Sequence, residues 1–141
     1  MRLQLITLQG VSVDTDIYEL RVPTDAGEIA IFPSHEPLVT MAAPGALTVR
    51  YKKEDDDAKL DYFAIGGGVI EVTYDAIRVL VDEADHAEDI IEDEAQAALD
   101  RALALKDAAK DSVELDKAHQ LIDRHVVRLR VAELQRRRRR M

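Results

Sequence analysis

The chain has no cysteine, no tryptophan and few aromatic side chains: Phe, Trp and Tyr together make up 4% of its 141 residues. The absence of thiols excludes disulfide bonds, thiolate catalysis and cysteine-ligated metal sites. No stretch approaches the roughly 20 apolar residues that span a bilayer, so we expect no direct bilayer insertion. Hydrophobic residues still amount to 47% and charged residues to 33%. This balance predicts a water-soluble chain with a substantial core.

Positive charge is scarce in the first part of the chain and concentrated at its end. Residues 1–84 contain 7 Lys or Arg and 15 Asp or Glu, whereas residues 120–141 contain 8 Arg and 2 acidic residues. Uniform nucleic-acid binding requires a basic face on the body of a protein, and this body is acidic, so we expect no nucleic-acid partner. A basic end on an acidic body favours contact with an acidic protein partner through that end.

The hydrophobic pattern through about residue 84 has a period of two residues, which is typical of half-buried antiparallel strands. Turn signals separate the apolar stretches at residues 24–27, 43–45, 54–57 and 66–68. Short strands without intervening helices predict an antiparallel β-sandwich or a barrel over residues 1–84. The apolar faces comprise Tyr18, Leu20, Val22, Leu47, Val49, Tyr51, Leu60, Tyr62, Ala64, Ile70, Val72, Tyr74, Ile77, Val79 and Val81.

After Asp85 the pattern becomes helical, and residues 88–141 are predicted to form an antiparallel hairpin of two helices. Asp111 and Glu114 are spaced as an N-cap pair that begins the second helix. The first helix presents mostly alanine, which buries little area, so the hairpin is either a mobile element or a permanently docked one. The predicted inward positions are Ile91, Ala95, Ala98, Ala102 and Leu105, then Leu115, Ala118, Ile122, His125, Leu129 and Ala132.

The chain has no arrangement of side chains suited to catalysis or metal binding. Its histidines are His35, His86, His119 and His125, and none has the i,i+4 partner of a helical metal pair. No nucleophile lies beside a suitable base. We therefore predict no catalytic residues and no metal, although a jelly-roll enzyme is a formal alternative.

Two short runs resemble binding loops but lack the necessary residues. The three glycines at 66–68 precede neither Lys-Ser nor Lys-Thr, so they do not form a phosphate loop. The aspartates at 55–57 lack the alternating ligands and the central glycine of a calcium loop. We interpret the first run as part of a strand entry and the second as a solvated hairpin tip.

Three segments carry a resemblance to a known family. Residues 22–40 read VPTDAGEIAIFPSHEPLVT, residues 44–50 read PGALTVR, and residues 63–72 read FAIGGGVIEV. In order and spacing they resemble the motifs of the epsilon subunit of bacterial F-type ATP synthases, and the following hairpin fits that family as well. The resemblance implies a non-catalytic rotor subunit in a proton-translocating complex, peripheral on the cytoplasmic face of the bacterial plasma membrane.

The resemblance assigns the sandwich a linking role in the central stalk. In this family the sandwich holds the gamma subunit against the c-subunit ring, so both are implied as partners. The implied contact residues lie in a loop at about residues 28–38, and for one of them, His35, a surface histidine without a special task is the alternative. The loop residues are Glu28, Pro33, His35, Pro37 and Leu38.

The resemblance assigns the hairpin a regulatory role. In bacterial relatives the hairpin can extend along the stalk and obstruct ATP hydrolysis, with basic residues of its second helix against the beta (and alpha) catalytic subunits. The matching residues are Arg124, Arg128 and Arg130. The run Arg136 to Arg140 adds positive charge, but its position at the end of the chain favours a solvated, disordered tail for the last few residues.

The nucleotide motif of some relatives is degenerate in this chain. Those relatives bind ATP through Ile or Leu, then Asp-x-x-Arg-Ala, on the first helix. Asp93 and Ala97 match, but Gln96 replaces the arginine and Glu92 replaces the aliphatic residue. Losing a guanidinium and gaining a carboxylate both disfavour a polyphosphate. We predict no cofactor and weak or absent ATP binding. The alternative to the whole assignment is a stand-alone adaptor with a sandwich and a hairpin.

Overall fold

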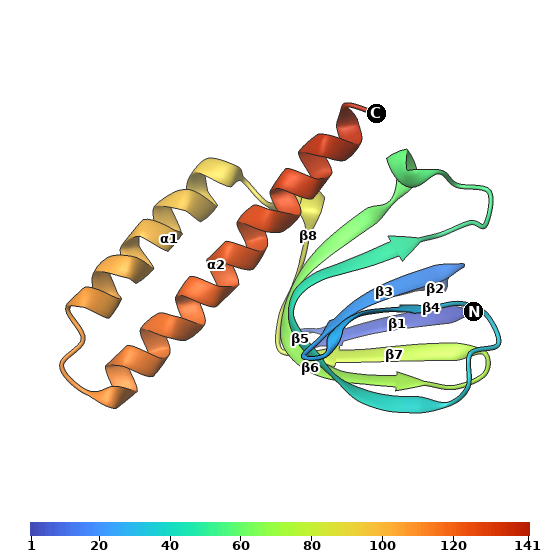
Figure 1. The fold of residues 1–141 in the computed structure, drawn as a ribbon, viewed down its shortest axis with the longest axis horizontal. Coiled ribbons are helices and arrows are strands. Elements are labelled where there is room, and N and C mark those ends of the chain that lie inside the picture. The colour runs from blue at the N-terminus through green and yellow to red at the C-terminus, as the bar shows by residue number, and fades with distance from the viewer.

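The computed structural model describes all 141 residues as a β-sandwich followed by two helices (Figure 1). This arrangement confirms the predicted fold class. The elements in chain order are β1 (Arg2–Thr7), β2 (Gly10–Asp16), β3 (Glu19–Thr24), β4 (Gly27–Ile31), β5 (Leu38–Arg50), β6 (Asp61–Val72), β7 (Ala76–Val81), β8 (Ala84–His86), α1 (Glu92–Asp107) and α2 (Ser112–Arg139), with short 3-10 turns at Asp57–Lys59 and Ala87–Asp89.

The strands follow the order β2-β1-β7-β6-β5-β3-β4, and β8 pairs with β6. All neighbouring pairs are antiparallel except β1 with β7, which run parallel. Sixteen buried residues, among them Leu5, Leu20 and Val79, fill the space between the two layers. Burial of this many aliphatic side chains gives the sandwich a core of its own, separate from the helices.

Two of the predicted turns, at residues 43–45 and 66–68, are instead bends within long strands. Pro44 lies opposite Gly66 inside the β5–β6 ladder. Gly67 has a φ of 101°, a backbone conformation that residues with a side chain rarely adopt. Gly68 lies so close to the backbone of β7 that no side chain fits there. Proline and glycine therefore bend this pair of strands without ending it, and Figure 1 shows β5 and β6 curving from one layer into the other.

The two faces of β6 belong to different cores. Phe63 and Ile65 point into the sandwich, whereas the alternating residues Leu60, Tyr62 and Ala64 are buried on its outer surface under α2. The period-two pattern predicted that this second set is buried but not what covers it. Tyr74, placed by the same pattern on a buried face, is exposed in the turn between β6 and β7.

The helices form the predicted hairpin, and α2 lies between α1 and the sandwich (Figure 1). The predicted N-cap is confirmed, because the amide N–H of Glu114 donates to the carboxylate of Asp111 at 2.8 Å. Ala95 and Ala102 are buried against α2 as expected. Three predicted inward positions, Ile91, Leu105 and Leu115, are wrong, because their side chains are exposed.

The boundary regions differ in detail from the sequence-based expectation. Strand β8 begins at Ala84, so the sheet continues to His86 before α1 begins at Glu92. The arginine run is helical as far as Arg139, which corrects the interpretation of these residues as a disordered tail. Neither α1 nor α2 combines the length and the apolar character that a membrane-crossing helix requires.

Candidate functional site

The first candidate site is the interface through which α2 docks on the sandwich. Val131 and Ala132 of α2 pack on Tyr62 and Ala64 of β6 and on Leu60, which directly precedes that strand. Further aliphatic side chains of α2 pack on this cluster, which is separate from the sandwich core. A hairpin held in this way can separate from the sandwich without disturbing the sandwich core.

Two of the predicted contact arginines lie at this interface. The Nε atom of Arg124 lies 2.7 Å from a carboxylate oxygen of Glu83, and that of Arg128 lies 3.4 Å from one of Asp85. Glu83 lies between β7 and β8 and Asp85 lies in β8. Neither was expected as a partner from the sequence, although a cluster of acidic residues after a strand is a visible signal. Arg130 lies apart, more than half exposed, and pairs only with Glu133 of its own helix.

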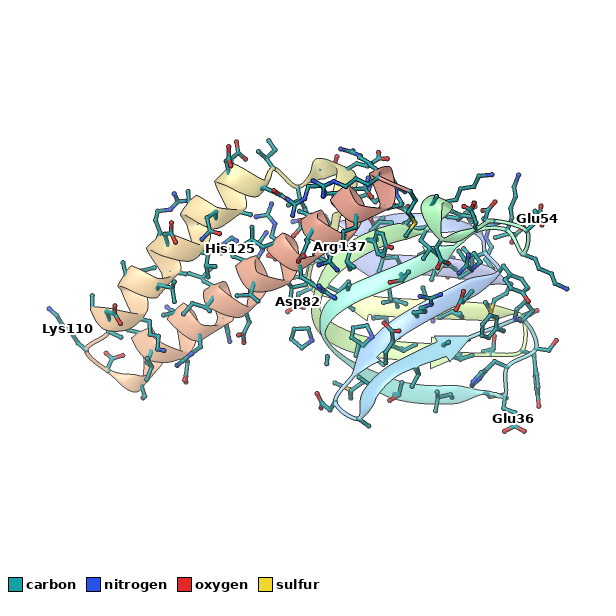
Figure 2. The ribbon with its side chains drawn as sticks, turned by 45° about the horizontal axis from the view of Figure 1, so that its top comes forward. Glu36, Glu54, Asp82, Lys110, His125 and Arg137 are labelled. Atoms are coloured by element: carbon teal, nitrogen blue, oxygen red, sulfur yellow. The ribbon has the colours of Figure 1, made fainter.

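A cleft of about 580 Å³ separates the edge of the sandwich from α2. Asp82 and Asp85 line one side, and Lys117 and Arg128 line the other. Mixed charge of this kind is internally compensated, because each side supplies partners for the other. Asp82 is labelled beside α2 in Figure 2.

The degenerate nucleotide motif does not reach this cleft. Asp93, Gln96 and Ala97 are all exposed on α1. The side-chain amide of Gln96 donates to the carboxylate of Asp100 at 3.1 Å, one helical turn further on. The three residues therefore share a helix face but are not gathered around a cavity.

The arginine-rich end of α2 forms hydrogen bonds both to α1 and to the segment that precedes β6. The Nη1 atom of Arg136 donates to both carboxylate oxygens of Glu92 at the start of α1, at 2.6 and 2.7 Å. The Nη1 atom of Arg138 donates to the backbone carbonyl of Leu60 at 2.7 Å. The sequence could not show these contacts, because they join residues 44 and 78 positions apart.

A polar network holds the linker between the two parts of the chain. The hydroxyl of Tyr51 donates to Asp61 at 2.7 Å, and Nε2 of His86 lies 2.6 Å from the same carboxylate. Burial and this carboxylate raise the pKa of Tyr51 well above its usual range. The His86 ring also packs on Phe63. The network ties β8, the last strand before the hairpin, to β6.

The predicted contact loop lies at the end of the sandwich remote from the hairpin. Figure 2 labels Glu36 at this end and Lys110 at the far end of the hairpin. Pro33 and Pro37 are exposed, and Nδ1 of His35 lies 2.7 Å from the carbonyl of Glu36. The loop is shorter than predicted, because Glu28 is in β4 and Leu38 begins β5.

A second surface, which was not expected from the sequence, lies on the outer face of the sandwich. Cross-strand pairing aligns Met41 with Val69, Val69 with Leu80, and Leu80 with Ile6. We call these four residues the outer apolar row. Met41 is 61% exposed and its neighbour Val39 71%, so this face is apolar and accessible. Such rows mark surfaces that a partner covers, and period-two alternation could have revealed this one if the outer positions had been read as well.

Comparisons with known proteins bear on this arrangement. The family model for the β-sandwich domain of the ATP synthase delta/epsilon chain matches residues 1–87. An ATP synthase epsilon chain of Neisseria meningitidis is 31% identical over 136 residues, covering 93% of this chain and 95% of the relative. One of Herpetosiphon aurantiacus is 34% identical over 139 residues, covering 98% of each chain.

Solved structures share the fold. A chain in the Euglena gracilis mitochondrial ATP synthase structure (OSCP/F1/c-ring) superposes with a TM-score of 0.74 at 23% identity, covering 88% of this chain and 76% of that one. A chain of the Tetrahymena thermophila mitochondrial ATP synthase (central stalk/c-ring) gives 0.62 at 11%, covering 94% and 96%. From the sandwich match and the near full-length relatives, the chain belongs to the ATP synthase epsilon subunit family.

Proposed function

We propose that this chain is a non-catalytic rotor subunit of the central stalk, which links the gamma subunit to the c-ring during proton-driven ATP synthesis. Its place is peripheral, on the cytoplasmic face of a bacterial plasma membrane. Membership of the epsilon family supports the stalk role, and the related folds come from assemblies described as F1/c-ring and central stalk/c-ring. The observation that carries the proposal is the outer apolar row on a rigid sheet.

The outer apolar row is the surface for gamma. Met41, Val69 and Leu80 lie on three adjacent strands whose opposite faces are buried in the core, so their positions are fixed by the sheet. A partner that covers these side chains gains affinity at little cost in conformational entropy, because the surface is already ordered. A rotor linkage that transmits torque requires a rigid surface of this kind.

The loop at the remote end of the sandwich is the surface for the c-ring. Its residues Pro33, His35 and Pro37 project where the hairpin does not reach, so both surfaces can be occupied at once. Two prolines limit the motion of the loop, which favours a defined contact. Glu28 and Leu38 flank the loop in β4 and β5.

The domain spanning residues 88–141 regulates ATP hydrolysis by exchanging partners. In the docked state Arg124 and Arg128 face Glu83 and Asp85, and in an extended state the same arginines, with Arg130, face acidic residues of the beta subunit, beside alpha. Partly exposed pairs of this kind are each worth about 0.5 kcal/mol, so the exchange has a small free-energy difference. Small differences permit populations of both states.

ATP is not a strong ligand of the docked hairpin. Asp93, Gln96 and Ala97 are exposed, and Arg124 is already paired with Glu83. We expect isothermal titration calorimetry of the purified chain with ATP to show no binding in the micromolar range. A micromolar dissociation constant would overturn this part of the proposal.

The gamma surface is tested by placing a charge in the outer apolar row. Met41→Asp is expected to reduce co-purification with gamma by about tenfold or more, because the carboxylate must be desolvated in the interface. Val113→Asp is the matched control, since Val113 is also 61% exposed but lies on α2. Equal capture of gamma by the two variants contradicts the assignment of this surface.

A further inference from the structure

His125 is the one histidine of the chain that is buried, and it lies in the hairpin. Its side chain is 9% exposed, and Figure 2 shows it between α1 and α2. Neighbouring inward positions are Ala102 of α1 and Ala118 of α2, both almost fully buried. Alanine leaves room for an imidazole ring in this seam but offers it no polar partner. The Nδ1 atom of His125 is buried without a hydrogen bond.

The charges that face His125 come from three elements and are mostly positive. Arg128 and Arg124 lie on its own helix, Arg101 faces it from α1, and Asp85 of β8 is the one opposing carboxylate. Arg128 and Arg124 already pair with that carboxylate, at 3.4 and 4.0 Å. A protonated imidazole at this position would therefore add a positive charge to three others without gaining a free counter-ion.

In the closed hairpin the pKa of His125 is held below its ordinary value of 6.5, mainly by burial and then by the positive charges of the three arginines. In an open hairpin the ring is hydrated and its pKa returns toward that value. The open state thus binds more protons than the closed state in the interval below pH 6.5. By linkage, the closed hairpin has its full stability above that pH and loses stability as the pH falls through the interval.

We propose that His125 is an acid-sensitive switch, whose neutral ring allows α1 to close on α2 and whose protonation drives the two helices apart. The geometry supports this switch in the hairpin alone, because α1 contacts no other element extensively. The alanine seam contributes little opposing free energy. Because the switch takes up one proton, the ratio of open to closed hairpin rises by up to about tenfold for each pH unit below the ordinary pKa of histidine.

The consequence for the synthase rests on the proposed function. If an open hairpin is the form that extends toward the catalytic subunits, acidification increases the population available to obstruct hydrolysis. A cell whose interior turns acidic would then conserve ATP. The switch itself is independent of that consequence, since it is a property of the isolated chain.

The test measures the distance between α1 and α2 in the isolated, full-length chain as the pH changes. The chain contains no cysteine, so Ala97→Cys and Asp116→Cys introduce a unique pair of exposed positions for spin labels, one on each helix. Double electron–electron resonance is expected to show a longer-distance population whose ratio to the closed one rises about tenfold between pH 7 and pH 5.5. His125→Gln, similar in size but without a proton to gain, is expected to abolish this rise.

His119→Gln is the matched control, because His119 lies on the same helix but is exposed. This variant is expected to open with acid as the unmodified chain does. An equal rise in His125→Gln, or no rise in the unmodified chain, overturns the switch. If His125→Gln does not fold, nuclear magnetic resonance titration of the His125 imidazole in the unmodified chain decides, and a midpoint at or above the ordinary value of 6.5 contradicts the proposal. None of these results depends on gamma or the c-ring.

Discussion

Removal of residues 88–141 is expected to raise ATP hydrolysis by the assembled complex about fivefold or more, while leaving the sandwich folded. The increase follows from the proposed obstruction by an extended hairpin, since allosteric couplings of this kind are worth about 1–3 kcal/mol. The sandwich survives because its sixteen-residue core is separate from the cluster under α2. Steady-state hydrolysis by complexes with the full and the shortened chain provides the measurement.

The control is a chain that ends after Arg139. It lacks only the last two residues, both exposed and beyond the end of α2, and keeps the contacts of Arg136 and Arg138. This chain should support the same hydrolysis rate as the full one. If removing the whole hairpin leaves hydrolysis unchanged, the hairpin is not an inhibitory brake under those conditions.

Gly68→Ala is expected to destabilise the sandwich by about 3 kcal/mol. A Cβ at this position would lie 2.0 Å from the backbone carbonyl oxygen of Leu80 and 2.8 Å from a methyl group of Val81. The clash involves backbone and cannot be relieved by rotating a side chain, so β6 and β7 must move apart. Thermal unfolding followed by circular dichroism should show a decrease of at least about 10 °C in the melting temperature.

Gly66→Ala serves as the control for this variant. Gly66 is two residues away on the same bent strand, but a Cβ there meets no atom within 4 Å. We expect its melting temperature to change by no more than about 2 °C, because only the backbone entropy differs. Similar losses in both variants would show that the bend itself requires glycine and that the close approach to β7 is not the cause.

The fold class could be predicted from the sequence because the hydrophobic pattern changes near residue 85 from a period of two residues to a helical period. Alternating positions such as Leu20 and Val22 can be buried only in a strand, and the Asp111–Glu114 pair identifies a helix start without tertiary information. The turn signals were less reliable than the hydrophobic periods. Pro44 and the three glycines carry the composition of turns, yet long-range pairing of β5 with β6 keeps them inside strands.

The contacts that define the sites could not be predicted in the same way. The family resemblance pointed to arginines on α2, but Glu83 and Asp85 became their partners only through the docking of α2. Burial of Leu60 and Tyr62 was predicted, whereas the helix that covers them was not. Family membership, established by relatives at 31% and 34% identity, replaces the adaptor alternative.

The central claim is that the sandwich links the rotor and the hairpin only regulates it. ATP-driven proton pumping, measured in vesicles with a complex assembled without this chain, tests both parts when residues 1–87 are added back. We expect the sandwich alone to restore pumping to the level of the full chain. Continued loss of pumping with residues 1–87, despite their incorporation into the complex, would contradict the linking role of the sandwich.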